Sequence, residues 1–103
     1  MKIYNKLVRD NIPEICKSNG QIAFVSVLDD EQYNIELRKK LSEEIQEFFD
    51  SGEIEELADI LEVVEALAAY NGYSFEKLLE IKEKKAIKNG KFDKRLFLEK
   101  VDN

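Results

Sequence analysis

Residues 37–70, LRKKLSEEIQEFFDSGEIEELADILEVVEALAAY, contain the pattern that decides the fold. Before the break at Asp50-Ser51-Gly52, apolar side chains recur at spacings of four, four and three residues, at Leu37, Leu41, Ile45 and Phe48. After the break the same kind of spacing continues at Ile54, Leu57, Leu61, Val64 and Ala68. Such spacing places apolar side chains on one face of an α-helix. The pattern therefore predicts one helix over 31–49 and a second over 53–70, joined as an αα-hairpin.

The flanking sequence adds two helices and one strand to this prediction. Asn11 stands before Pro13 as an N-cap would, which indicates a short helix that ends near Ser18. Ser74 is a similar N-cap for a helix that ends near Lys88. β-Branched and aromatic residues over 21–28 predict a strand. We therefore expect a single, mainly α domain over 1–103, an antiparallel bundle of about four helices with a short N-terminal strand element.

Composition and charge exclude several classes of partner. The chain of 103 residues has 16 Lys and Arg against 22 Asp and Glu, a net charge of −6, which disfavours binding to polyanions such as nucleic acid. It has no apolar run near the roughly 18 residues that a membrane span needs. The first residues show no signal-peptide pattern. We expect a cytoplasmic protein with no nucleic-acid or membrane partner.

The absence of histidine narrows the chemistry further. It removes Ser-His and Cys-His nucleophilic catalysis and every zinc site that needs an imidazole ligand. The single cysteine, Cys16, cannot form an intramolecular disulfide, and its apolar neighbours favour a packing role. Any chemistry must therefore use carboxylates, Lys, Arg, Tyr or a bound hard cation.

Several carboxylates do not fit a solvated helix face. With residues placed about 100° apart around the first helix of the hairpin, Glu44 falls within about 20° of Leu37, inside the apolar stripe. Glu47 and Glu43 flank it on one side. In the second helix, Glu56 and Asp59 both lie beside Val63 and interrupt an apolar surface. Buried acids are rare unless they are paired or bind a metal.

The acids of the two predicted helices lie at equal distances along the chain from the turn that joins the helices. About a hairpin centre between Ser51 and Gly52, Glu47 corresponds to Glu56 and Glu44 to Asp59. Packed helices have axes about 8 to 10 Å apart, so the side chains can converge. Like charges so close need protons or a cation, and ligation by oxygen alone points first to Mg²⁺, then to Mn²⁺ and less to Ca²⁺. Periodicity alone leaves a chance arrangement of surface acids as an almost equal alternative.

The motifs resemble a known family. EEIQE at 43–47 and ELAD at 56–59 match the EExxE and ExxD pair of the MazG-like, all-α nucleoside triphosphate pyrophosphatases. The run YNKLVRDNIP at 4–13, together with the closing segment 90–98, is similar to a small stand-alone branch labelled phosphoribosyl-ATP pyrophosphohydrolase-like. The resemblance covers nearly the whole chain. It implies Mg²⁺-dependent hydrolysis between the α and β phosphates of a nucleotide, with a house-cleaning role on non-canonical triphosphates as our preferred interpretation.

The resemblance also implies roles for individual residues. The metal ligands would come from five carboxylates, namely Glu43, Glu44, Glu47, Glu56 and Asp59. Glu44 or Glu47 would act as the general base for water. Phosphate and cofactor contacts would come from Asn5, Lys6 and Arg9 in the opening run and from Lys82 and Lys85 on the last helix. For the two last-helix lysines, solvated charges near a helix C-terminus are an equal alternative.

Assembly and activity each leave alternatives. The lone strand and the nearly all-round apolar second helix predict a homodimer or homotetramer, as does the family resemblance. Two non-catalytic hypotheses compete with the hydrolase: an acidic helical module that binds a basic partner, and a nucleotide-sensing accessory protein without turnover. Under the first, Glu44 and Asp59 would be replaceable without effect. Under the second, nucleotide would bind without being hydrolysed.

Overall fold

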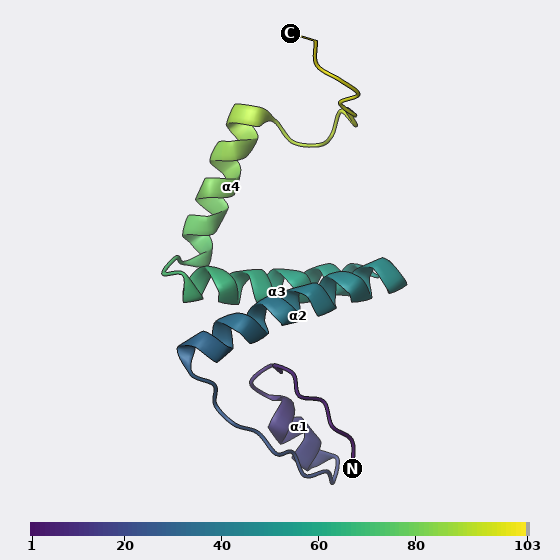
Figure 1. Cartoon of the computed structure of the whole chain (residues 1–103), viewed down its shortest axis with the longest axis vertical. Helices are drawn as coiled ribbons and strands as arrows, with labels where there is room; N and C mark the ends of the chain where they lie inside the picture. Colours follow the sequence, from purple (N-terminus) through teal and green to yellow (C-terminus); the bar gives the residue numbers. More distant parts are fainter. Residues whose placement is uncertain (103) are drawn as a thin grey trace.

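The computed structural model describes residues 1–102 and contains four helices in that range (Figure 1). They are α1 (Ile12–Ser18), α2 (Asp30–Ser51), α3 (Ile54–Tyr70) and α4 (Phe75–Asn89). Helices α2 and α3 pack side by side as an antiparallel hairpin, and α4 packs only against α3 before it projects away from the pair (Figure 1). None of the four is both long enough and apolar enough to cross a bilayer. The mainly α prediction is confirmed.

The hairpin begins and ends where its capping residues dictate. The Asp29 side chain accepts a hydrogen bond from the Gln32 backbone N–H at 2.8 Å, which satisfies a free donor of the first turn of α2. At the other end Gly52 takes a left-handed φ of 69° and its N–H donates to the Phe48 carbonyl at 2.8 Å. The helix therefore extends only one to two residues past each predicted end, and the predicted break is confirmed.

The Asp29 cap gives a first testable expectation. We expect Asp29→Ala to lower the free energy of unfolding by about 1 kcal/mol, because an N-cap hydrogen bond at the start of α2 is lost. Asp30→Ala is the matched control, since Asp30 lies within the first turn and makes no capping bond. The measurement is urea unfolding followed by circular dichroism. Equal losses in the two variants would contradict a capping role for Asp29.

The shorter helices also begin near the predicted residues. Pro13 lies in the first turn of α1, and Asn11 is the N-cap residue, as predicted, although its side chain makes no capping hydrogen bond. Ser74 does cap α4, since its Oγ accepts from the Lys77 N–H at 3.1 Å. Gly90 follows the last residue of α4, at the predicted stop. The turn residues therefore determine where each of these helices ends.

The predicted strand over 21–28 is wrong. These residues form no strand, and neither do residues 3–9; within residues 1–102 there is no strand at all. A strand must exchange backbone hydrogen bonds with another, and the helices occupy most of the remaining chain. Phe24 and Val27 are exposed in this segment, which connects α1 to α2. Residues 21–28 have high β-propensity but no strand to pair with, so they form a connecting segment.

The core is confined to the contact between α2 and α3. Leu37 and Val63 are the only buried apolar residues of the described part of the chain, one on each helix of the hairpin. The third buried side chain is charged: Glu44 on α2. The molecule is long, with principal extents of 62 × 32 × 24 Å. A carboxylate therefore occupies part of the small volume that holds the hairpin together.

Candidate metal centre

Glu44 is the centre of the candidate site. The residue is only 7% exposed, and its Oε2 is buried with no hydrogen-bond partner. The Oε2 of Glu56, on the facing helix, is likewise buried and unpartnered. Buried polar atoms are nearly always satisfied, because an unmade bond costs about 1–3 kcal/mol and more for a charge. Two such oxygens on facing helices leave acceptors free to bind a cation.

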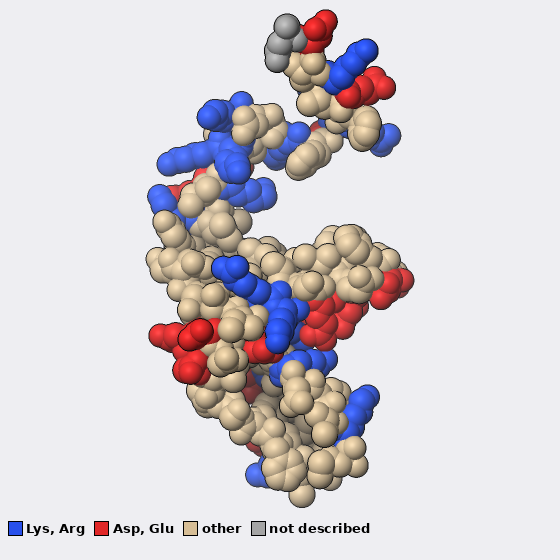
Figure 2. Space-filling model, in the orientation of Figure 1, with Lys and Arg blue, Asp and Glu red and all other residues tan. Residues whose placement is uncertain are grey.

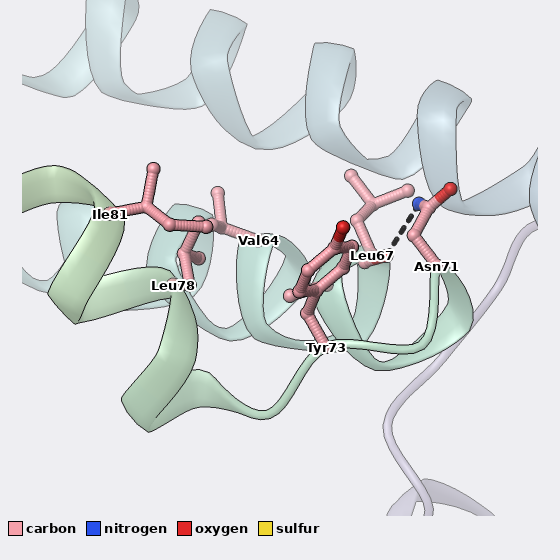
Figure 3. Close-up of a pocket in the computed structure, with 7 residues that line it drawn as sticks. Val64, Leu67, Asn71, Tyr73, Leu78 and Ile81 are labelled. Atoms are coloured by element: carbon pink, nitrogen blue, oxygen red, sulfur yellow. Dashed lines mark hydrogen bonds between the residues drawn. The ribbon is translucent and has the colours of Figure 1, made fainter.

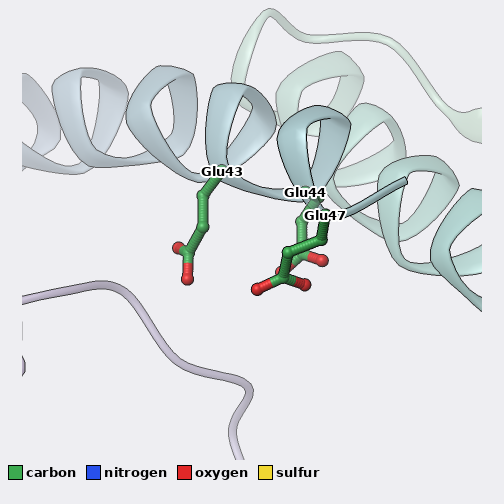
Figure 4. Close-up of side chains that lie close together, drawn as sticks. All are labelled: Glu43, Glu44 and Glu47. Carbon is green, nitrogen blue, oxygen red and sulfur yellow. The ribbon is translucent and has the colours of Figure 1, made fainter. Parts of the chain in front are cut away.

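Five acids surround this position in two overlapping groups. One carboxylate oxygen each from Glu43, Glu44 and Glu47 lie within 4.8 Å of one another, and so do oxygens from Glu44, Glu56 and Asp59. Figure 4 shows the first group projecting from one side of α2 toward the N-terminal segment. The structure thus brings together all five of the predicted metal ligands, and Glu44 belongs to both groups.

The spacing suits a divalent cation. Oxygen ligands on opposite sides of Mg²⁺ are about 4 Å apart, and those around Ca²⁺ are about 5 Å apart. Oxygens within 4.8 Å of one another therefore need only small side-chain rotations to reach a common ion. The donor set contains oxygen alone, which is the ligand type that Mg²⁺ and Mn²⁺ prefer. The residues present fit such an ion.

Three cations lie against the acids. The Lys6 Nζ is 2.9 Å from a Glu43 carboxylate oxygen, and the Arg9 guanidinium is 2.7 Å from Asp59. Lys40 lies 3.1 Å from Glu43 and 3.3 Å from Glu44. No ion pair within residues 1–102 involves Glu47 or Glu56. Three positive charges against five negative ones leave an excess of two, the charge of one divalent cation.

Lys40 is a member of the site that the sequence interpretation missed. Its spacing to Glu43 and Glu44 is i,i+3 and i,i+4, which places all three side chains on one side of α2. That spacing was visible in the sequence. Lys40 is largely buried, and its ammonium group partly neutralises the carboxylates of Glu43 and Glu44.

The surroundings shift two of the carboxyl groups in opposite directions. Burial raises the pKa of the Glu44 carboxyl above its usual value, the neighbouring Glu47 carboxyl adds to this, and Lys40 opposes it. The Lys6 ammonium, by its hydrogen bond, holds the pKa of Glu43 below its usual value and has its own pKa raised in return. Glu43 is therefore held ionised by a charged partner, while the buried Glu44 carboxylate is only partly compensated by Lys40.

The opening segment is folded over the acids by an unusual turn. Asn5 has a φ of 46°, in the left-handed region that asparagine tolerates better than most residues. The adjacent Lys6 reaches Glu43 on α2, and Arg9 reaches Asp59 on α3. Two cations only three residues apart thus contact both helices of the hairpin. The structure brings Asn5, Lys6 and Arg9 to the edge of the site, and their contacts with phosphate stay a prediction.

The last-helix lysines lie elsewhere. Lys82 and Lys85 are on α4, which contacts α3 alone and projects away from the hairpin (Figure 1). Figure 2 shows basic side chains clustered over α4, apart from the acidic side chains at the turn end of α2 and α3. A single chain therefore does not bring Lys82 and Lys85 to the carboxylates. Their predicted phosphate contacts remain a prediction.

Comparison with known proteins adds no assignment. No family model, no curated protein and no solved structure matches the chain. The chemistry of the site is therefore derived from its own residues: two groups of carboxylates on facing helices, two unpartnered buried oxygens, and cations on an adjacent segment.

Proposed function

We propose that the protein is a Mg²⁺-dependent nucleotide pyrophosphohydrolase that cleaves between the α and β phosphates of a nucleoside triphosphate. The observation that carries this proposal is the buried Glu44 carboxylate, which has an unpartnered oxygen. Glu44 belongs both to the group of acids on α2 and to the group that joins α2 to α3. A hard cation is the simplest group that compensates it. The EExxE and ExxD motifs around it support nucleotide hydrolysis as the reaction.

The carboxylates divide into ligands and a base. Glu44, Glu56 and Asp59 would hold the ion, because their oxygens converge from two helices, and Glu43 would add a ligand from the other group, which it shares with Glu44. When bound, Mg²⁺ would neutralise phosphate charge and lower the pKa of a coordinated water. Glu47 is exposed and has no cation partner among the described residues, so its carboxylate is free to accept a proton from that water. We assign Glu47 as the general base, with Glu44 as the alternative.

The opening segment would receive the phosphates. Lys6 and Arg9 reach the acids from outside the hairpin and are 40% and 56% exposed at their side chains. Each can therefore turn from a carboxylate toward an incoming phosphate without disturbing the core. Arg9 offers two parallel N–H donors and Lys6 a point charge, the two modes by which proteins bind phosphate. Non-canonical triphosphates remain our preferred substrates, and a homo-oligomer in the cytoplasm our preferred context.

The test is product release from a panel of canonical and modified nucleoside triphosphates with Mg²⁺ or Mn²⁺. Monophosphate and pyrophosphate are expected in equal amounts from at least one nucleotide. We expect Asp59→Asn and Glu47→Gln each to lower kcat by 100-fold or more, because the first loses a ligand and the second the base. Glu62→Gln is the matched control, an exposed glutamate of α3 outside both groups.

The outcome separates the proposal from its alternatives. Release of orthophosphate instead of pyrophosphate would reject cleavage between the α and β phosphates. Nucleotide binding without turnover in either metal would favour a sensing protein. No nucleotide binding, together with unchanged metal binding in Asp59→Asn, would reject the site and favour an acidic interaction module.

A further inference from the structure

Residues 1–28 form an arm that lies against the hairpin without packing into it. The arm consists of the opening segment, α1 and the connection to α2 (Figure 1). Helix α1 packs against none of the other three helices. No residue of the arm is buried, and large apolar side chains of the connection, such as Phe24 and Val27, are exposed. Apolar packing therefore does little to hold the arm in place.

Two ion pairs attach the arm to the hairpin. The Lys6 Nζ lies 2.9 Å from Oε1 of Glu43 on α2. The Arg9 guanidinium lies 2.7 Å from Oδ1 of Asp59 on α3. Within residues 1–102 these two pairs are the only hydrogen bonds or ion pairs that join the arm to the rest of the chain. Both acids are candidate metal ligands, so the polar contacts that fix the arm use carboxylates that a divalent ion would also use.

Helix α4 is attached in a different way. Where it contacts α3, apolar side chains such as Val64, Leu78 and Ile81 line one groove between the two helices (Figure 3). No hydrogen bond or ion pair of the described residues joins these two helices. Apolar contacts do not use charged groups, whereas ion pairs between exposed groups contribute little to stability. A divalent ion should therefore leave α4 in place and act on the arm.

Metal ligation and attachment of the arm compete for the same oxygens. Both oxygens of Glu43 are engaged, Oε1 by Lys6 and Oε2 by Lys40. An ion held by Glu43 or Asp59 would also lie close to the arm cation that now contacts that carboxylate, and like charges at short range repel. The two arm cations, Lys6 and Arg9, together carry the charge of one divalent ion. Their exchange for an ion therefore leaves the net charge of the site unchanged.

We propose, on the basis of the metal site in the proposed function, that the arm is an internal counter-ion: it is docked in the ion-free protein and leaves the hairpin when Glu43 and Asp59 become ligands of a divalent ion. The side chains of the two ion pairs are between 30% and 56% exposed, so ions can reach them. Residues 21–28 are neither helix nor strand and make no hydrogen bond to the hairpin, so the arm can swing on them.

The exchange has two consequences. Release of the arm frees Lys6 and Arg9 from their carboxylates, so that they can bind phosphate only after the ion has bound. The competition is also reciprocal, because two ligands of one site change each other's affinity by the same factor. Loss of arm docking must therefore tighten Mg²⁺ binding.

The first test follows the arm directly. Cys16 is the single cysteine of the chain and lies on α1, so a spin label attached there reports on the arm. A second label at Glu65→Cys gives a distance from the arm to α3, and saturating Mg²⁺ is expected to broaden that distance distribution. In a Cys16→Ser background, labels at Glu65→Cys and Glu83→Cys give the control distance from α3 to α4, which should not change. An unchanged arm distance at a Mg²⁺ concentration that raises Tm overturns the proposal.

The second test measures the reciprocal effect and needs no label. The double variant Lys6→Gln/Arg9→Gln removes both ion pairs and is expected to lower the Kd for Mg²⁺ by about 10-fold or more. Lys2→Gln/Lys17→Gln is the matched control, since it removes the same charge from the arm but none of its ion pairs with the hairpin. Equal Kd values for the two double variants in titration calorimetry overturn the proposal.

Neither test involves a nucleotide, so failure of the exchange is distinguishable from failure of the proposed function. Mg²⁺ that binds and releases the arm, without turnover of any nucleotide, would reject the hydrolase and support the exchange. Turnover by a protein whose arm stays docked in Mg²⁺ would do the reverse. A protein that binds no Mg²⁺ has no exchange, and both proposals would then be wrong.

Discussion

Replacing Glu44 with glutamine is expected to stabilise the ion-free protein and, in the same variant, to abolish its stabilisation by Mg²⁺. The side chain keeps its shape, but it no longer carries the negative charge whose burial raises the pKa of Glu44. We expect the free energy of unfolding without metal to rise by on the order of 1 kcal/mol, which is a rise of about 4–8 °C in Tm for a chain of this size.

The stabilisation of the protein by Mg²⁺, in contrast, is expected to be lost in the glutamine variant. A cation at 100 times its Kd stabilises the wild type by about 2.7 kcal/mol, provided that it binds the folded state only. Glu44 belongs to both carboxylate groups, so the glutamine variant loses a ligand from each. Thermal unfolding with and without Mg²⁺ measures both effects. Glu62→Gln should match the wild type, and a Glu44→Gln variant that still responds fully to Mg²⁺ would contradict the site.

The same comparison has a defined pH dependence. Because the folded-state pKa of Glu44 is raised above 4.5, its ionisation destabilises the ion-free fold at neutral pH. Protonation removes that penalty, so the stability difference between wild type and Glu44→Gln should close as the pH falls through the raised pKa toward 4.5. The lowered pKa of Glu43 acts only below 4.5 and is common to both proteins. A difference that is constant over this range would show that burial of charge is not its cause.

Replacing Arg9 with glutamine is expected to strengthen Mg²⁺ binding and to weaken nucleotide binding. The Arg9 guanidinium contacts Asp59 at 2.7 Å, so it would compete with a metal for that carboxylate. Its removal should lower the Kd for Mg²⁺ several-fold. Nucleotide, in contrast, loses a charge-assisted hydrogen bond worth about 1.5–3 kcal/mol, so its Kd should rise by about 10- to 150-fold.

Titration calorimetry separates the two effects, first with Mg²⁺ alone and then with a non-hydrolysable triphosphate in saturating Mg²⁺. Lys17→Gln is a suitable control, since it removes a charge from α1 without touching an ion pair of the described residues. If Arg9→Gln weakened both ligands equally, the side chain would only support the fold. If it changed neither, the N-terminal segment would not belong to the site.

The hairpin and its acids could be predicted because both depend on local periodicity. The spacing of Leu37, Leu41 and Ile45 fixes which face of α2 is buried, and the same rotation places Glu44 on that face. The turn at Gly52 then fixes which residues of α3 are opposite. A residue's neighbours across a short antiparallel turn follow from counting, so the meeting of Glu44 with Asp59 was accessible from the sequence.

Features that depend on contacts between distant parts of the chain could not be predicted from the sequence. Residues 21–28 have the composition of a strand, but whether a pairing partner exists is a property of the whole fold. The direction of α4 depends on the backbone angles of the short connection between Tyr70 and Phe75, and these decide that Lys82 and Lys85 are distant from the acids. The φ of Asn5, which brings Lys6 to Glu43, is likewise invisible to periodicity.

The compact spacing of the five acids along the chain also sets an order of events during folding. All of them lie within 17 consecutive residues, 43–59, on the two sides of one tight turn. Closing a loop of this size takes well under a microsecond, and such local contacts are the earliest that a helical chain makes. The carboxylates therefore come together among the first contacts that the chain makes, and a newly made hairpin already offers a cation its ligands.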